Sequence, residues 1–177
     1  MTDLVQIQFK ASDLDNVATV TGRIAIFLDP EGKPDLAGRK INTLTRKTID
    51  RIVAGPGFAK AKTGQVLEIA FPTGLAAEAL LVVKLPRKCT IGEARKAGAA
   101  IARHRGTGDL LVLAGAMTRA ADMAFGLVLR AYEFTTHKTA ALDPVGSVTV
   151  MANDPEAVAR QAAPMAALAR GCFSPAT

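Results

Sequence analysis

Two short apolar runs constrain the fold of this chain more than any other feature. Leu80 to Val83 and Leu110 to Leu113 contain no polar residue. Continuous runs of this kind are typical of strands that are covered on both faces, as in the sheets of α/β proteins. A stretch with a helical pattern lies between the two runs. The chain is therefore predicted to alternate strands with helices.

Periodicity and capping patterns locate the other elements. Thr90 and Glu93 form a capping-box pattern, and Asp154-Pro155-Glu156 is a strong helix start. Pro72-Thr73-Gly74 favours a hairpin-like connection, and Pro164 should kink or shorten the last helix. Strands are predicted at about 4–9, 23–28, 65–71, 78–85, 109–113 and 145–151, and helices at about 38–54, 90–104 and 154–170. A further helix is predicted to begin near Thr118 and to be apolar almost all round from Met123 to Leu129.

About six strands with four helices between them indicate the α/β class. We expect a single domain over residues 1–177, with a largely parallel or mixed sheet covered by helices on both faces. Apolar residues make up 49% of the chain but aromatic residues only 5%, and there is no Trp. Alanine and the aliphatic residues must then fill the core, and the many alanines predict closely packed helices.

The residues that usually carry chemistry are sparse. His104 and His137 are far apart and have no carboxylate partner nearby in sequence. No motif of a zinc peptidase, a serine hydrolase or a nucleotide-binding loop occurs. Surface histidines are therefore the favoured interpretation, with a ligand or catalytic role as the alternative. We predict no catalytic, cofactor-binding or metal-binding residue in this chain.

The two cysteines, Cys89 and Cys172, do not form a disulfide framework. Reduced thiols in a cytosolic protein are the simplest interpretation. Cys89 lies just before the predicted capping box, where a helix N-terminus could lower the pKa of its thiol. An ordinary thiol at a strand-to-helix junction is the alternative.

No signal peptide or membrane span is visible, so we expect a soluble, cytoplasmic protein that makes no membrane contact.

Charge is the one functional signal in the composition. The formal net charge is +6, but two stretches, 33–62 and 84–105, together carry +12. Such a surface can be solvated, can face another domain or can bind DNA non-specifically. The candidate basic surface consists of Lys40, Arg46, Lys47 and Arg51 on one predicted helix and Arg95, Lys96 and Arg103 on another.

Several segments resemble the N-terminal, non-catalytic domain of the leucyl aminopeptidases, also called cytosol aminopeptidases. The segment 123–139 resembles the place in that family where a buried helix ends in an aromatic element followed by a lysine. The corresponding residues here are Arg130, Tyr132, Phe134 and Lys138. Further similar segments, in the family's order, are Gly64-Gln65, Arg95 to Ala99 and Ala169 to Phe173.

The resemblance implies a macro-domain-like, three-layer α/β/α fold. It also implies a parent enzyme that releases N-terminal residues from peptides with two divalent metal ions, zinc or manganese. Those ions belong to a catalytic domain that is expected to begin where this chain stops. The chain would then be an excised domain or a natural truncated relative.

The resemblance also suggests partners, namely the chain's own catalytic domain and a homo-oligomer, a hexamer in the family. The expected role is assembly or regulation, without activity in this chain alone. A stand-alone module that contacts nucleic acid through the basic helices is the alternative, since some bacterial members of the family also bind DNA. An ADP-ribose-binding macro domain is a third interpretation, but the sequence lacks a glycine-rich phosphate loop.

Overall fold

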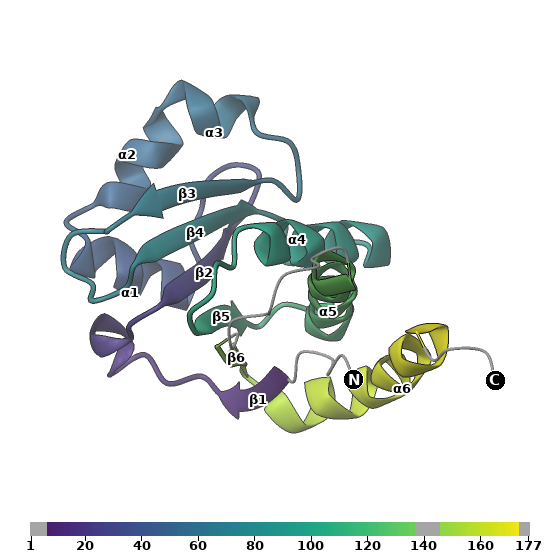
Figure 1. The fold of residues 1–177 in the computed structure, drawn as a ribbon. Coiled ribbons are helices and arrows are strands. Elements are labelled where there is room, and N and C mark those ends of the chain that lie inside the picture. Colours follow the sequence, from purple (N-terminus) through teal and green to yellow (C-terminus); the bar gives the residue numbers. More distant parts are fainter. Residues whose placement is uncertain (1–6, 137–145, 174–177) are drawn as a thin grey trace.

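Six strands in one sheet, with helices on both sides, form the body of the molecule (Figure 1). The computed structural model describes residues 7–136 and 146–173, with side chains described at 7–131 and 146–165. The strands are β1 (Ile7–Ala11), β2 (Arg23–Leu28), β3 (Val66–Ala70), β4 (Ala79–Lys84), β5 (Leu110–Gly115) and β6 (Val148–Ala152). The helices are η1 (Val17–Thr19), α1 (Leu36–Leu44), α2 (Thr48–Ala54), α3 (Pro56–Lys60), α4 (Ile91–Arg103), α5 (Ala120–Thr136) and α6 (Pro155–Phe173).

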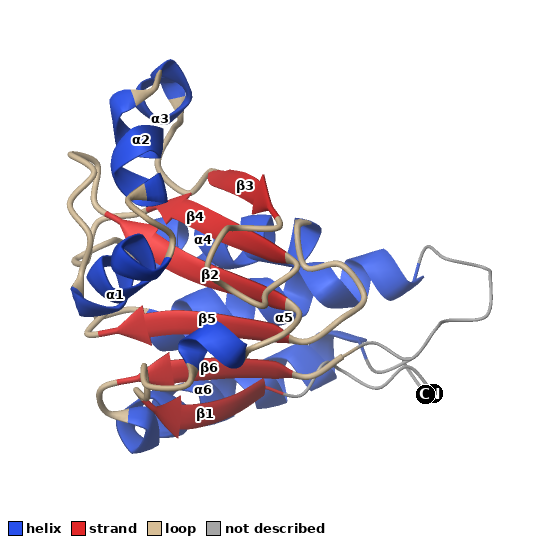
Figure 2. Cartoon of the chain, turned by 90° about the vertical axis from the view of Figure 1, so that its left-hand side faces the viewer, coloured by secondary structure: helices blue, strands red, loops and turns tan. Residues whose placement is uncertain are grey.

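The sheet is mixed, with strand order β1-β6-β5-β2-β4-β3. Five strands run parallel, and β3 pairs antiparallel with β4 at one edge. The hairpin predicted at Pro72 to Gly74 is thus confirmed. Figure 2 shows the arrowheads of β2, β5 and β6 at the same end of the sheet, where α1 lies.

Two separate hydrophobic clusters lie on the two faces of the sheet. One joins alternate residues of β2 and β4 to α4 and α5, with Ala97, Ile101 and Leu127 buried between them. The other joins the intervening strand residues to the short helices α1 to α3, through Ile41 and Phe58. The predicted α/β class and the helices on both faces are therefore confirmed. The apolar strands β4 and β5 are buried on both faces, as their sequences indicated.

The predicted helix 38–54 is wrong as a single element, because α1 ends at Leu44 and α2 begins at Thr48. Arg46 and Lys47 lie between them with φ of 54° and 63°, in the left-handed region. The buried Thr45 hydroxyl donates to the carbonyl of Ile41, which satisfies a carbonyl at the end of α1. Lys40, Arg46, Lys47 and Arg51 therefore do not share one helix.

The other boundaries differ by a few residues, as expected for ends set by local hydrogen bonds. Thr90 and Glu93 form the capping box at the start of α4, with both reciprocal hydrogen bonds present. The helix α3, which begins at Pro56, was not predicted. The helix α6 continues through Pro164 to Phe173, so the proline does not end it. The first part of the strand predicted at 4–9, residues 4–6, lies outside the described residues.

Candidate functional site: a pocket at the strand ends

A pocket of about 420 Å³ opens where β2 and β5 separate. The two strands pair only as far as Ala25 and Val112, although β2 continues to Leu28 and β5 to Gly115. The chain leaves β2 toward α1 on one face of the sheet and leaves β5 toward α5 on the other face. Such a topological switch point creates a crevice at the carboxyl ends of the strands, where α/β proteins bind ligands.

The lining of this strand-end pocket combines an apolar floor with charged groups. Phe27, Leu85 and Leu113 are buried beneath it. Charged and polar residues come from loops that follow four different strands and from the first turn of α1. They are Ser12, Asp29, Lys33, Asp35, Arg39, Arg87 and Asn153. The sequence did not single out these residues, because strand order is needed to see that their loops meet.

Asp35 is the best-positioned charged group in the strand-end pocket. It is the N-cap of α1, where its Oδ1 accepts a hydrogen bond of 2.8 Å from the amide of Gly38. Burial raises the pKa of Asp35, while this hydrogen bond and the guanidinium groups of Arg39 and Arg87 act in the opposite direction. Arg87 is held in turn by its Nε, which donates to the carbonyl of Ala116 at 3.5 Å.

The candidate basic surface is divided by the sheet. Lys40 and Arg51 lie on α1 and α2, which pack on one face, and the turn with Arg46 and Lys47 joins these helices. Arg95, Lys96 and Arg103 lie on α4, which packs on the opposite face. All seven side chains are exposed. They form two groups, so one flat partner surface does not meet both at once.

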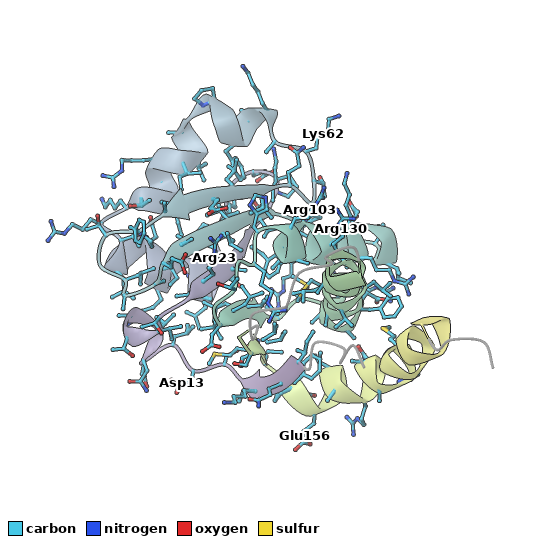
Figure 3. All side chains as sticks on the ribbon, viewed as in Figure 1. Asp13, Arg23, Lys62, Arg103, Arg130 and Glu156 are labelled. Atoms are coloured by element: carbon cyan, nitrogen blue, oxygen red, sulfur yellow. The ribbon has the colours of Figure 1, made fainter. Side chains whose placement is uncertain are left out.

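The cations on α4 also make contacts within the domain. Arg95 lies 3.6 Å from the Asp122 carboxylate and stacks over the Phe125 ring, 4.8 Å from its centre. The aliphatic part of Lys96 lies against Gly64, ahead of the edge strand β3. Figure 3 shows Arg103 on α4, with Lys62 above it in the loop that precedes β3.

His104 has a carboxylate partner that its sequence neighbours did not reveal. Its Nδ1 lies 2.9 Å from Oε2 of Glu68 on β3. Arg23 lies 3.0 Å from the other oxygen of Glu68 and donates to the carbonyl of His104 at 2.6 Å. The hydrogen bond from His104, with a smaller contribution from Arg23, holds the pKa of Glu68 below its ordinary value. This cluster joins β2, β3 and the end of α4.

The suggestion that the helix N-terminus lowers the pKa of Cys89 is wrong. Cys89 is buried in the core beneath α4, and burial raises the pKa of its thiol, with the carboxylate of Glu93 acting in the same direction. The alternative, an ordinary buried thiol at a strand-to-helix junction, fits this environment. Cys172 and His137 lie outside the residues whose side chains are described.

The described residues do not fit a two-metal centre. Over 7–131 and 146–165, no three His, Cys, Asp or Glu side chains are grouped so that they could hold a metal ion. Among the helices that the structure describes, none combines the length and apolar character that a membrane span requires. The strand-end pocket combines buried apolar residues with charged groups of both signs.

Comparisons with known proteins identify relatives over nearly the whole chain. The model of the cytosol aminopeptidase family, N-terminal domain, matches residues 24–141. A probable cytosol aminopeptidase of Cereibacter sphaeroides is 46% identical over 98% of this chain and 35% of its own length. One of Dinoroseobacter shibae is 36% identical over 98% of this chain and 36% of its own length. The chain thus spans about a third of these curated relatives.

Solved structures agree on the fold. A variant of tomato leucine aminopeptidase superposes with a TM-score of 0.71 and 15% identity, covering 97% of this chain and 38% of the tomato chain. A Trypanosoma brucei macrodomain in complex with ADP-ribose superposes with a TM-score of 0.62 and 13% identity, covering 92% of this chain and 68% of the macrodomain chain. The predicted macro-domain-like fold is therefore confirmed.

The stand-alone nucleic-acid module is not supported, because the family match and the relatives are aminopeptidases. The chain belongs to the cytosol aminopeptidase family and corresponds to the N-terminal domain of its members.

Proposed function

We propose that this chain is the non-catalytic third of a metal-dependent leucyl aminopeptidase and that its role is assembly. The observation that carries the proposal is coverage: 98% of the chain aligns with only 35% of the Cereibacter sphaeroides relative. In this proposal, the two divalent ions, zinc or manganese, and the hydrolysis of peptides belong to the remaining two thirds. The partners are that catalytic domain and further copies of the whole protein, a hexamer by the family resemblance.

One exposed aromatic side chain supports an assembly role. Phe71, directly after β3, is 78% exposed, and its φ is 48°. A bulky residue in the left-handed region is strained, and strain of this kind is often kept for a function. Aromatic side chains that become buried in an interface contribute much of its binding energy. Phe71 is therefore the contact residue that we assign to a partner domain or subunit.

A chimeric enzyme tests the proposal. The chain would replace the matching third of the Cereibacter sphaeroides relative, and particle mass and hydrolysis of a leucyl chromogenic substrate would be measured. We expect the chimera to assemble beyond a single chain and to hydrolyse the substrate, whereas the catalytic part alone does neither efficiently. A catalytic part that assembles and works equally well without this domain would contradict the proposal.

Phe71→Gly provides the matched variant. Glycine adopts a positive φ readily, so the substitution relieves strain and removes only the exposed ring. We expect the isolated variant domain to remain folded. The chimera that carries the substitution should dissociate at a higher protein concentration than the unaltered chimera. Arg51→Gln, another exposed position, on α2, is the control and should leave the particle mass unchanged.

A further inference from the structure

We propose that the strand-end pocket binds a free α-amino acid with an apolar side chain. Three features of the pocket lining favour such a ligand: charges of both signs, an apolar floor and the position of the Asp35 carboxylate. None of them depends on the assembly role or on the activity of longer relatives.

The lining presents both signs of charge in nearly equal amounts. Asp29 and Asp35 contribute two carboxylates, and Arg39 and Arg87 contribute two guanidinium groups. Lys33 also lines the pocket, but its Nζ lies 3.2 Å from the carboxylate of Glu31. A polyanion such as a nucleoside diphosphate would meet two carboxylates there, and like charges held close together are unfavourable. An ammonium and a carboxylate on one small molecule satisfy both signs.

The floor suits an aliphatic side chain. Phe27, Leu85 and Leu113 are at most 7% exposed, and they supply apolar lining to the pocket from both faces of the sheet. Leu14 and Met117, which are half-buried, lie at its sides. Burial of apolar surface drives such contacts, and the volume of about 420 Å³ lies within the range of ligand pockets, about 300–1,000 Å³. The space accommodates a single amino acid and leaves room for a second residue.

Gly115, at the end of β5, lies beside the carboxylate of Asp35, and both residues line the pocket. A Cβ added at Gly115 would lie 3.0 Å from Oδ2 of Asp35, and φ at this glycine is 58°. Oδ1 already accepts the amide of Gly38. We therefore assign Oδ2 to the ammonium group of the ligand. Arg87, anchored on the carbonyl of Ala116, and Arg39 are assigned to its carboxylate.

The first test compares ligands by isothermal titration of the full 177-residue chain. The probes are L-leucine, N-acetyl-L-leucine, which lacks the ammonium group, and L-leucinamide, which lacks the carboxylate. We expect L-leucine to bind saturably and each analogue to bind at least about tenfold more weakly, because each loses a charge-assisted hydrogen bond. Leucyl-leucine tests whether the pocket prefers a single amino acid or a short peptide. Tighter binding of the dipeptide than of L-leucine would overturn the proposal that the ligand is a single amino acid.

Three other results would also overturn the proposal. They are no saturable binding of L-leucine at millimolar concentration, binding of either analogue as tightly as L-leucine, and tighter binding of a nucleoside diphosphate. These outcomes are decided on the unaltered chain, so none of them depends on a variant that folds.

The second test assigns the groups. Asp35→Asn keeps an N-cap acceptor for Gly38 but removes the charge. We expect this substitution to weaken the binding of L-leucine at least about tenfold and to change the binding of N-acetyl-L-leucine little, because only L-leucine carries an ammonium group. Arg87→Gln should lose the preference for L-leucine over L-leucinamide. Arg51→Gln, outside the pocket, is the control. If Asp35→Asn retains full discrimination between L-leucine and its acetylated form, the assignment of Asp35 is wrong.

Discussion

The two helical layers of the molecule are built in different ways. On one face, α4 and α5 approach so closely that a Cβ added at Gly98 would collide with the carbonyl oxygen of Met123, and one at Gly126 with that of Arg95. On the other face lie three short helices, the first two of which are joined by a left-handed turn, and large side chains such as Ile41 fill the layer. We infer that the closely packed α4–α5 layer relaxes less around a change in side-chain volume than the layer of short helices does.

Truncation of buried side chains should give the largest difference in stability between the two layers. Leu127→Ala, on the fully buried face of α5, should lower the free energy of unfolding by about 2–5 kcal/mol. Ile41→Ala, equally buried on α1, should cost less within that range, because the short helices can relax into the cavity. Leu129 is only half-buried, so Leu129→Ala should cost less still. Denaturant unfolding measures all three, and a larger loss for Ile41→Ala would reverse the comparison.

The contact between α4 and α5 can be tested within one helix. Gly98→Ala places a methyl group against the backbone of α5 and should cost about 1–3 kcal/mol or more. Gly92→Ala, near the start of the same helix, meets nothing within 4 Å and should be neutral or slightly stabilising. Equal thermal midpoints for the two variants would show that the helices are not in close contact.

Substitutions at the helix starts should change the stability of the protein differently in the two layers. Thr90→Ala removes the cap of α4 and should cost about 1 kcal/mol, whereas Thr90→Ser should retain most of it. Lys47 precedes α2 in the left-handed region without a side-chain cap hydrogen bond. Lys47→Gly should therefore leave stability unchanged or raise it slightly. A clear loss of stability in Lys47→Gly would show that this turn is better optimised than we infer.

The smallest effect concerns the cluster at the end of α4. Because the pKa of Glu68 is lowered in the folded state, its contribution is present above the ordinary carboxyl pKa and is lost as the pH falls through the lowered value. Glu68 is partly exposed, so we expect less than about 1 kcal/mol. Unfolding measured from pH 6 to pH 3 should show a shallower decline in Glu68→Gln than in the wild type. Parallel curves would contradict this.

Much of the α4–α5 layer could be predicted from sequence because its signals are local. The capping box at Thr90 and Glu93, the apolar strands and the buried helix around Leu127 each follow from residues a few positions apart. The turn at Arg46 and Lys47 could not be predicted in this way. Neither residue type favours a positive φ, and the tertiary contacts of Ile41 and Ile49 place the helices on either side of it.

The strand-end pocket required information that no local pattern contains. Asp35 and Arg87 follow different strands, and only the strand order brings them together beside the end of β5. The pairing of His104 with Glu68 likewise joins residues 36 positions apart. The candidate basic surface illustrates the converse, since charges that form two dense stretches in sequence lie on opposite faces of the sheet.

We propose that this chain is a domain of an aminopeptidase and has no activity of its own. The most direct measurement is hydrolysis of a leucyl chromogenic substrate by the purified 177-residue chain, with manganese or zinc added. Activation of water by a metal ion requires a set of protein ligands, and the described residues offer no such cluster. We predict no metal-dependent turnover above the buffer rate. Turnover that depends on the metal and copurifies with the chain would contradict the claim.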